Sequence, residues 1–226
     1  MLRIKMFKRI LSAVVLMACV GSANAAIISQ DIVVPRNNAL SDPIVPKIRF
    51  LSFNLFDNLG GTRVLDSVDI QMIASGTGKL TFVNNSASSD TFNVTFSTLV
   101  SLLFIEQGYS LVAQPSEVIS EFTLGSFATH VIERGAGEVT DTVSTSITDA
   151  GLLALFTGNG QNDFRFSHTG NSTIGTDADN YTVTRTTFSQ GNVNIVYNYS
   201  YVPATGSFSL LLLGIGMMTL RRFSKA

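Results

Sequence analysis

Hydrophobic and polar residues alternate, or hydrophobic residues cluster in short runs, along most of the chain between residues 27 and 202. No stretch of this region keeps the 3.6-residue period of an amphipathic helix. The pattern therefore predicts strands separated by turns rich in Gly, Asn, Asp and Ser. Ten strands are expected, at residues 27–34, 47–56, 67–75, 78–84, 91–103, 117–124, 137–146, 162–169, 181–188 and 193–202.

Turn residues gather between several of these strands. The expected turns lie at residues 58–61, 76–78, 84–86, 158–160 and 190–192. Residues 149–156 form the one expected helix of the region, capped by Thr148 or Asp149 and ended near Gly158.

The last expected strand has the clearest alternation. Its odd positions are Val193, Ile195, Tyr197, Tyr199 and Tyr201, and its even positions include Asn192, Asn194, Asn198 and Ser200. Successive side chains of a strand point to opposite faces, so we expect one face of this strand to pack and the other to meet water.

Ten short strands without interleaved helices predict an all-β fold, an antiparallel β-sandwich. Parallel strands would need long crossover connections, usually helices, which the sequence lacks. The length of 226 residues suits one such domain at residues 26–201, flanked by terminal segments at 1–25 and 202–226.

Residues 1–25 have the three parts of a cleavable secretory signal peptide. The apolar run at residues 10–20 predicts a signal helix, too short to span a bilayer permanently, which needs about 20 residues. Ala23 and Ala25 are the small residues before the expected cleavage point. The basic residues that precede the run are Arg3, Lys5, Lys8 and Arg9.

Cys19 is the only cysteine of the chain. Residues 16–19 resemble a lipobox, so an alternative is a lipid-anchored protein in which Cys19 is acylated. Removal of residues 1–25 would instead leave a mature chain without any thiol, and therefore without disulfides, thiolate metal sites or a cysteine nucleophile.

The C-terminal segment has a comparable order. A short motif, Val202-Pro203-Ala204-Thr205-Gly206, precedes a hydrophobic helix expected at about residues 207–220, and Arg221 and Arg222 follow it. Its apolar core of 13 residues spans about 20 Å as a helix, less than the ~30 Å hydrocarbon layer. We therefore expect a transient hold on the membrane, with the arginines on the cytoplasmic side.

This order of motif, apolar helix and arginine pair resembles the PEP-CTERM class of sorting signals, although Pro203 stands without the Pro-Glu-Pro of that class. The resemblance implies processing by an exosortase-type membrane enzyme. Residues 202–206 also resemble a sortase motif, which would imply attachment to peptidoglycan. A plain membrane tail that is never processed is the third alternative.

The region between the two ends has a second resemblance. Residues 56–70 with 76–85, and later residues 149–160, are similar to the choice-of-anchor E domain, over about residues 27–201 in all. The resemblance implies a bacterial surface domain that is attached by different C-terminal anchors in different species. It implies no known activity.

Charge is distributed unevenly along the chain. Seven of the 15 basic residues lie in the two terminal segments, which leaves 8 basic and 16 acidic residues between them, a net charge of −8. A domain of this charge repels nucleic acid. The partners that we expect are the secretion translocon, signal peptidase, an exosortase-like enzyme, the membrane (transiently) and an exopolysaccharide.

No catalytic set emerges from the motifs. His130 and His168 have no metal-ligand spacing with a second His or Cys, and no Gly-x-Ser-x-Gly elbow occurs. Residues 76–79 match part of a phosphate loop, but Ile73 and Leu80 stand where that motif needs Gly and Ser or Thr. We therefore expect a non-enzymatic protein without a cofactor, and keep a hydrolase that uses either histidine as a remote alternative.

Two polar or aromatic groups offer binding hypotheses. Asp177 and Asp179 are weak calcium candidates, because hard cations take several oxygen ligands from one short loop. Tyrosines of a sandwich can bind sugars through exposed rings, which makes a carbohydrate-binding surface module an alternative function. The tyrosines in question are Tyr181, Tyr197, Tyr199 and Tyr201.

Overall fold

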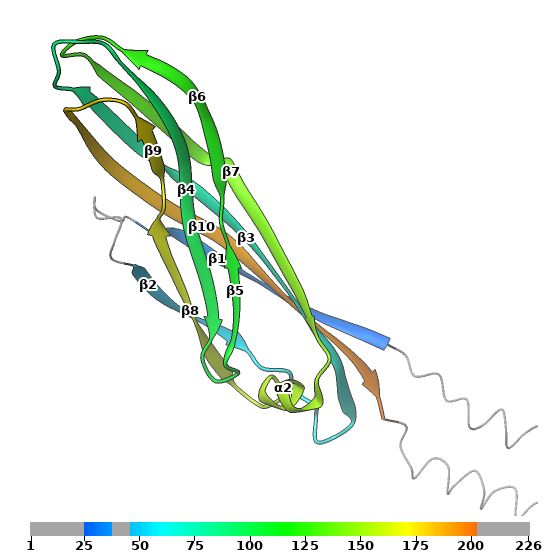
Figure 1. The fold of residues 1–226 in the computed structure, drawn as a ribbon. Coiled ribbons are helices and arrows are strands. Elements are labelled where there is room, and N and C mark those ends of the chain that lie inside the picture. The colour runs from blue at the N-terminus through cyan, green and yellow to red at the C-terminus, as the bar shows by residue number, and fades with distance from the viewer. Residues whose placement is uncertain (1–24, 38–45, 203–226) are drawn as a thin grey trace, which may run out of the picture.

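The computed structural model describes residues 25–37 and 46–202, which form ten strands and one short helix. Every ladder between these strands is antiparallel, and the strands form two sheets packed face to face (Figure 1). The expected class, an antiparallel β-sandwich of about ten strands, is confirmed. The signal helix and the hydrophobic helix at 207–220 lie outside the described residues.

One sheet has four strands in the order β1-β10-β3-β7. Their bounds are β1 Ala25–Asn37, β10 Tyr181–Tyr201, β3 Arg63–Asn84 and β7 Thr129–Ile147. In register, Ala25 lies opposite Ser200, so the first and last strands are neighbours. The first and the last described residues of the chain therefore lie at the same end of the sandwich (Figure 1).

The second sheet has six strands and is organised around β4, Asp90–Phe104. The second half of β4 lies between β8 and β5, with β2 outside β8, and its first half pairs with β6 and β9. The other bounds are β2 Lys47–Asn54, β5 Tyr109–Ala113, β6 Ser116–Leu124, β8 Gln161–Gly170 and β9 Thr173–Thr176.

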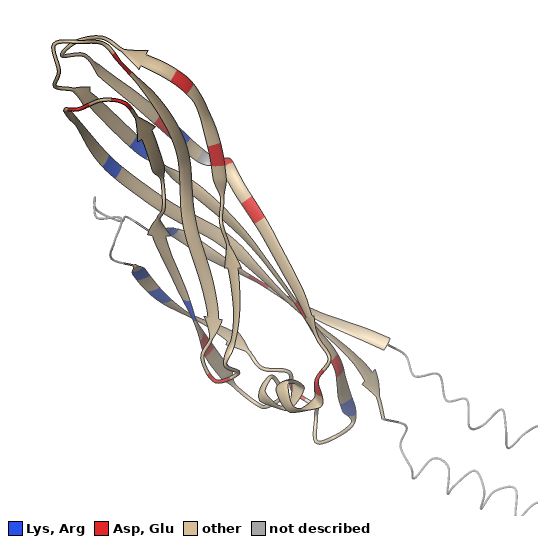
Figure 2. Ribbon diagram, in the orientation of Figure 1, with Lys and Arg blue, Asp and Glu red and all other residues tan. Residues whose placement is uncertain are grey.

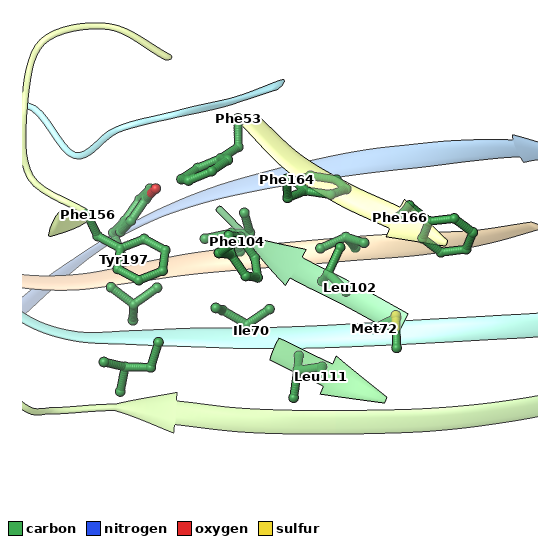
Figure 3. Close-up of a cluster of buried hydrophobic side chains, with 14 of the residues drawn as sticks. Phe53, Ile70, Met72, Leu102, Phe104, Leu111, Phe156, Phe164, Phe166 and Tyr197 are labelled. Carbon is green, nitrogen blue, oxygen red and sulfur yellow. The ribbon is translucent and has the colours of Figure 1, made fainter. Parts of the chain in front are cut away.

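A phenylalanine-rich core fills the half of the sandwich near the helix (Figure 3). Alternate residues of each strand point inward, which buries Ile70 and Met72 on β3 and Phe164 on β8 to 1% exposure or less. The Phe53 and Phe104 rings meet edge to face with centroids 5.3 Å apart. Each such side chain stabilises the fold by about 1.5–3 kcal/mol through burial, so this cluster is the main source of stability.

A second, smaller core lies at the other end of the sandwich, where Phe82, Phe92 and Phe96 are fully buried. A layer of small and polar residues separates the two cores, because the inner faces of β3, β4 and β10 carry glycine, threonine or serine there in place of large apolar side chains. This polar layer consists of Thr98 on β4, His168 on β8, and Thr187 and Ser189 on β10.

Two of the expected turns are wrong. Residues 76–78 lie inside β3 and residues 190–192 inside β10, where Gly76 pairs with Ser189 and Gly191 with Ala74. A β-carbon on Gly191 would lie 2.7 Å from the carbonyl oxygen of Ile73. Glycine therefore allows the strands to approach closely here, and four expected strands merge into two long ones.

The expected helix is confirmed as α2, Ala150–Leu155, and Asp149 is its cap. The Asp149 carboxylate accepts a hydrogen bond from the backbone N–H of Leu152 at 3.0 Å. The expected turns at 58–61, 84–86 and 158–160 are confirmed as well. The pattern did not predict β5 or β9, and β7 begins at Thr129, before its expected start.

Candidate functional site

A row of polar side chains crosses the outer face of the four-stranded sheet. Asp31, Asn194, Gln71 and Ser144 are register partners on β1, β10, β3 and β7. Their chain neighbours, such as Ile70 and Ile195, point into the core, so this row points away from it. The outward polar positions expected for the last strand, Asn192, Asn194 and Asn198, are partly exposed on this face.

A shallow hollow of about 490 Å³ lies in this face, which we call the polar hollow. It spans the three strands β10, β3 and β7. Its lining residues are Asp69, Ile70, Gln71, Ser144, Thr145, Ser146 and Asn194. Ile70 and Thr145 turn their side chains inward, so the side chains that face the hollow are the Asp69 carboxylate, the amides of Gln71 and Asn194, and the hydroxyls of Ser144 and Ser146.

Amide side chains hold the two carboxylates of this surface in place. The Asn194 amide donates to Asp31 Oδ1 at 2.6 Å, and the Asn198 amide donates to Asp69 Oδ2 at 2.6 Å and to Ser67 Oγ at 2.9 Å. A carboxylate offers about four lone-pair sites, so both groups keep the capacity to accept further hydrogen bonds.

A second hollow of about 360 Å³ lies farther along the same sheet and is richer in basic residues. Lys79 forms an ion pair with Glu133 at 2.8 Å, Arg134 pairs with Glu117, and Arg36 stacks on the Phe188 ring at 4.1 Å. Its cations are therefore engaged with the protein, and Figure 2 shows basic and acidic residues distributed along the length of the sandwich.

The two histidines lie in different surroundings and do not meet. His168 is 2% exposed in the polar layer, opposite Lys47 and Val100 in register, whereas His130 is exposed and its ring lies 4.5 Å from that of Phe122. Burial lowers the pKa of His168, and the positive charge of Lys47 lowers it further. His168 is therefore a neutral imidazole at pH 7.

Three buried polar atoms of the polar layer have no hydrogen-bond partner in the described part of the chain. They are Nδ1 of His168, Oγ1 of Thr98 and Oγ of Ser189. Buried polar groups of this kind raise the free energy of the fold unless water reaches them.

The calcium candidates lie on an exposed turn between β9 and β10. Near Asp177 and Asp179 the turn is held by the backbone N–H of Ala178, which donates to Thr176 Oγ1 at 3.0 Å. Within residues 25–37 and 46–202, no group of three or more His, Cys, Asp or Glu side chains could hold a metal ion.

Two of the four expected sugar-binding tyrosines are buried. Tyr197 and Tyr199 are 1% and 5% exposed, because they lie on the inner face of β10. The Tyr197 hydroxyl donates to the carbonyl oxygen of Asn54 at 2.7 Å. Only Tyr181 and Tyr201 keep substantial exposure, so the hypothesis that all four rings are available to a sugar is wrong.

Most residues of the two terminal signals lie outside the described residues, namely Ala23, Pro203, Ala204, Thr205, Gly206, Arg221 and Arg222. Ala25 and Val202 mark the two described ends, and the backbone N–H of Val202 donates to the carbonyl oxygen of Thr62 at 2.9 Å. In the part of the chain that the structure covers, no helix is long and apolar enough to cross a membrane.

No family model and no curated protein matches the sequence. Among solved structures, the chain is similar to the VP2 subviral particle of infectious bursal disease virus, with 8% identity over 81% of this chain and 43% of that one, at a TM-score of 0.26. A disulfide-linked pilus protein of Bacillus endospore appendages has 9% identity over 79% of this chain and 94% of that one, at 0.22.

A third similar structure is the N-terminal endo-1,4-β-D-xylanase 10B of Clostridium thermocellum, complexed with xylohexaose, with 16% identity over 57% of this chain and 17% of that one, at a TM-score of 0.13. The chain spans less than half of the VP2 chain and less than a fifth of the xylanase chain. Likenesses at these TM-scores carry no functional inference.

Proposed function

We propose that this protein is a non-enzymatic bacterial β-sandwich that is exported and displayed at the cell surface or in the extracellular matrix. Signal peptidase removes residues 1–25, and an exosortase-type enzyme processes the PEP-CTERM-like signal at 202–226. The observation that carries the proposal is the pair of three-part address segments at the two ends of the chain.

The positions of the first and last strands support this proposal. β1 begins at Ala25, the last residue of the expected signal peptide, and β10 ends at Tyr201, directly before the expected sorting motif. Since Ala25 pairs with Ser200, the two address segments join the sandwich side by side. The domain can therefore be held at one end while its other end points away from the membrane (Figure 1).

Three other modes of attachment make different predictions for the mature chain. Sortase attachment would cut within residues 202–206 and add a cell-wall fragment. Acylation of Cys19 would leave Cys19 as the first residue and add the mass of lipid. An unprocessed tail would keep residues 208–220 in the membrane fraction.

Intact-mass measurement on the protein from an exosortase-containing bacterium separates these cases. We expect a chain that begins at Ala26 and lacks residues 208–220, found outside the inner membrane. An Arg221→Ala/Arg222→Ala variant should keep the apolar segment, and Lys225→Ala, which leaves the arginine pair intact, should be processed normally. A full-length chain in the cytosol would overturn the proposal.

A further inference from the structure

We propose that the polar hollow binds a neutral polysaccharide, through hydrogen bonds from the outer face of the four-stranded sheet. The inference rests on the proposed function, because it names the ligand of a domain displayed where polysaccharides occur. It places the ligand on the opposite side of β10 from the buried rings of Tyr197 and Tyr199.

The side chains that line the polar hollow can form hydrogen bonds with the hydroxyl groups of a polysaccharide. The Asp69 carboxylate accepts hydrogen bonds, and the amides of Gln71 and Asn194 both donate and accept them. The hydroxyls of Ser144 and Ser146 do the same from the neighbouring strand. A sugar hydroxyl is itself both donor and acceptor, so it can use any of these partners.

The charge of the surface excludes several other ligand classes. Asp69 lines the hollow and Asp31 lies beside it, and no Lys or Arg is among the lining residues. Nucleic acids, phosphates and uronate polymers would meet two carboxylates without a compensating cation. A purely apolar ligand would leave the polar lining without partners, which is unfavourable.

The next row of the sheet offers complementary apolar surface. Val33, Asn192 and Ile73 are register partners beside the row of Asp31, Asn194 and Gln71. Val33 is 68% exposed and Ile73 is 41% exposed. Sugar rings carry C–H groups as well as hydroxyls, and an apolar row beside a polar row suits both.

The binding groups are held on a rigid platform. β10 and β3 are central strands of the sheet, paired on both sides, and amide hydrogen bonds already fix Asp31 and Asp69. Little order has to be created when a ligand binds, which reduces the entropic cost of association.

Affinity electrophoresis of the purified mature protein tests the inference, with gels that contain cellulose ether, xylan, galactomannan, dextran or alginate. We expect retardation by at least one of the four neutral polymers and none by alginate, which is a uronate. Gln71→Ala and Asp69→Ala should each raise the Kd at least tenfold. Gln114→Ala, the same substitution at an exposed loop position, should leave it unchanged.

Melting temperatures of the variants keep the result interpretable, because Gln71 is exposed and its replacement should not unfold the sheet. Retardation by none of the neutral polymers, unchanged retardation in both variants, or a preference for alginate would each overturn the inference. The export proposal is decided separately by the mass of the mature chain, so failure of one leaves the other standing.

Discussion

The side chain of Thr187 fills the place that a side chain at Gly170 would need. Thr187 belongs to the four-stranded sheet and Gly170 to the six-stranded one, and a β-carbon on Gly170 would lie 2.7 Å from Thr187 Oγ1. A reciprocal contact joins Thr98 and Gly76, where the corresponding distance is 2.8 Å. Each sheet therefore presses a threonine against a glycine of the other within the polar layer.

Gly170→Ala should overpack this contact and lower the free energy of unfolding by about 1–3 kcal/mol, measured by urea denaturation. Gly175→Ala is the matched control, because the nearest atom to its β-carbon would lie 3.8 Å away. The double variant Gly170→Ala/Thr187→Ala should lose less stability than the sum of the two single changes. Strictly additive losses would show that the two residues do not compete for the same space.

Removal of the Tyr197 hydroxyl should destabilise the sandwich. In Tyr197→Phe the Asn54 carbonyl loses a donor at 2.7 Å and the Gln30 amide loses an acceptor at 3.2 Å, at a cost of about 1–2 kcal/mol. Tyr181→Phe, on a residue that is 39% exposed, should cost less than about 0.5 kcal/mol. Equal effects of the two changes in thermal denaturation would contradict the proposed role of the buried hydroxyl.

Stability should fall when the pH drops below neutral, because of His168. Its pKa is lowered in the fold, first by burial and then by Lys47, so between that value and about 6.5 the unfolded chain binds a proton that the folded chain does not. The free energy of unfolding contributed by this group is therefore fully present above about pH 6.5 and is lost as the pH falls.

Urea denaturation at pH 7.5 and pH 5.5 measures the effect. His168→Gln should flatten the difference between the two conditions whatever its effect on absolute stability. A pH dependence that survives the His168 change would assign the effect to other groups.

Asp149→Ala should weaken α2 by about 0.5–2 kcal/mol, because the Leu152 N–H loses its acceptor at the start of the helix. Leu153 and Phe156 pack in the larger core, so the lost helix stability should lower the free energy of global unfolding. Thr148→Ala tests the alternative cap and should have little effect. A larger loss from the Thr148 change would reverse the assignment.

Local patterns were sufficient where one segment determines the outcome. The alternation of the last strand predicted that Val193 and Ile195 would pack while Asn194 and Asn198 would meet water, and the structure confirms it. The short helix and its acidic cap were equally accessible, because a cap depends on residues three positions apart.

Patterns failed where glycine serves long-range packing. Gly76 and Gly191 look like turn residues in the sequence, yet both lie in the middle of long strands and allow another part of the chain to approach closely. Glycine is suited both to a turn and to a close approach of two segments, and only the pairing of the strand shows which of the two applies.

The polar hollow could not be predicted from the sequence, again because it depends on contacts between distant segments. The polar side of β10 was expected, but its alignment with Asp69, Gln71 and Ser144 depends on the register between three strands that are distant in sequence. Sequence alternation gives the face of each residue within its own strand, and tertiary pairing gives the neighbours.

The hydrogen bond between Asn194 and Asp31 joins positions 163 residues apart. In the described part of the chain β1 pairs with β10 alone, so the strand that is made first has to wait for the strand that is made last. Contacts of such long range form slowly, because a very large loop must close before they contribute. A chain that emerges N-terminus first, from a ribosome or through a narrow channel, therefore leaves β1 unpaired until β10 has emerged as well. The four-stranded sheet can be completed only at that point.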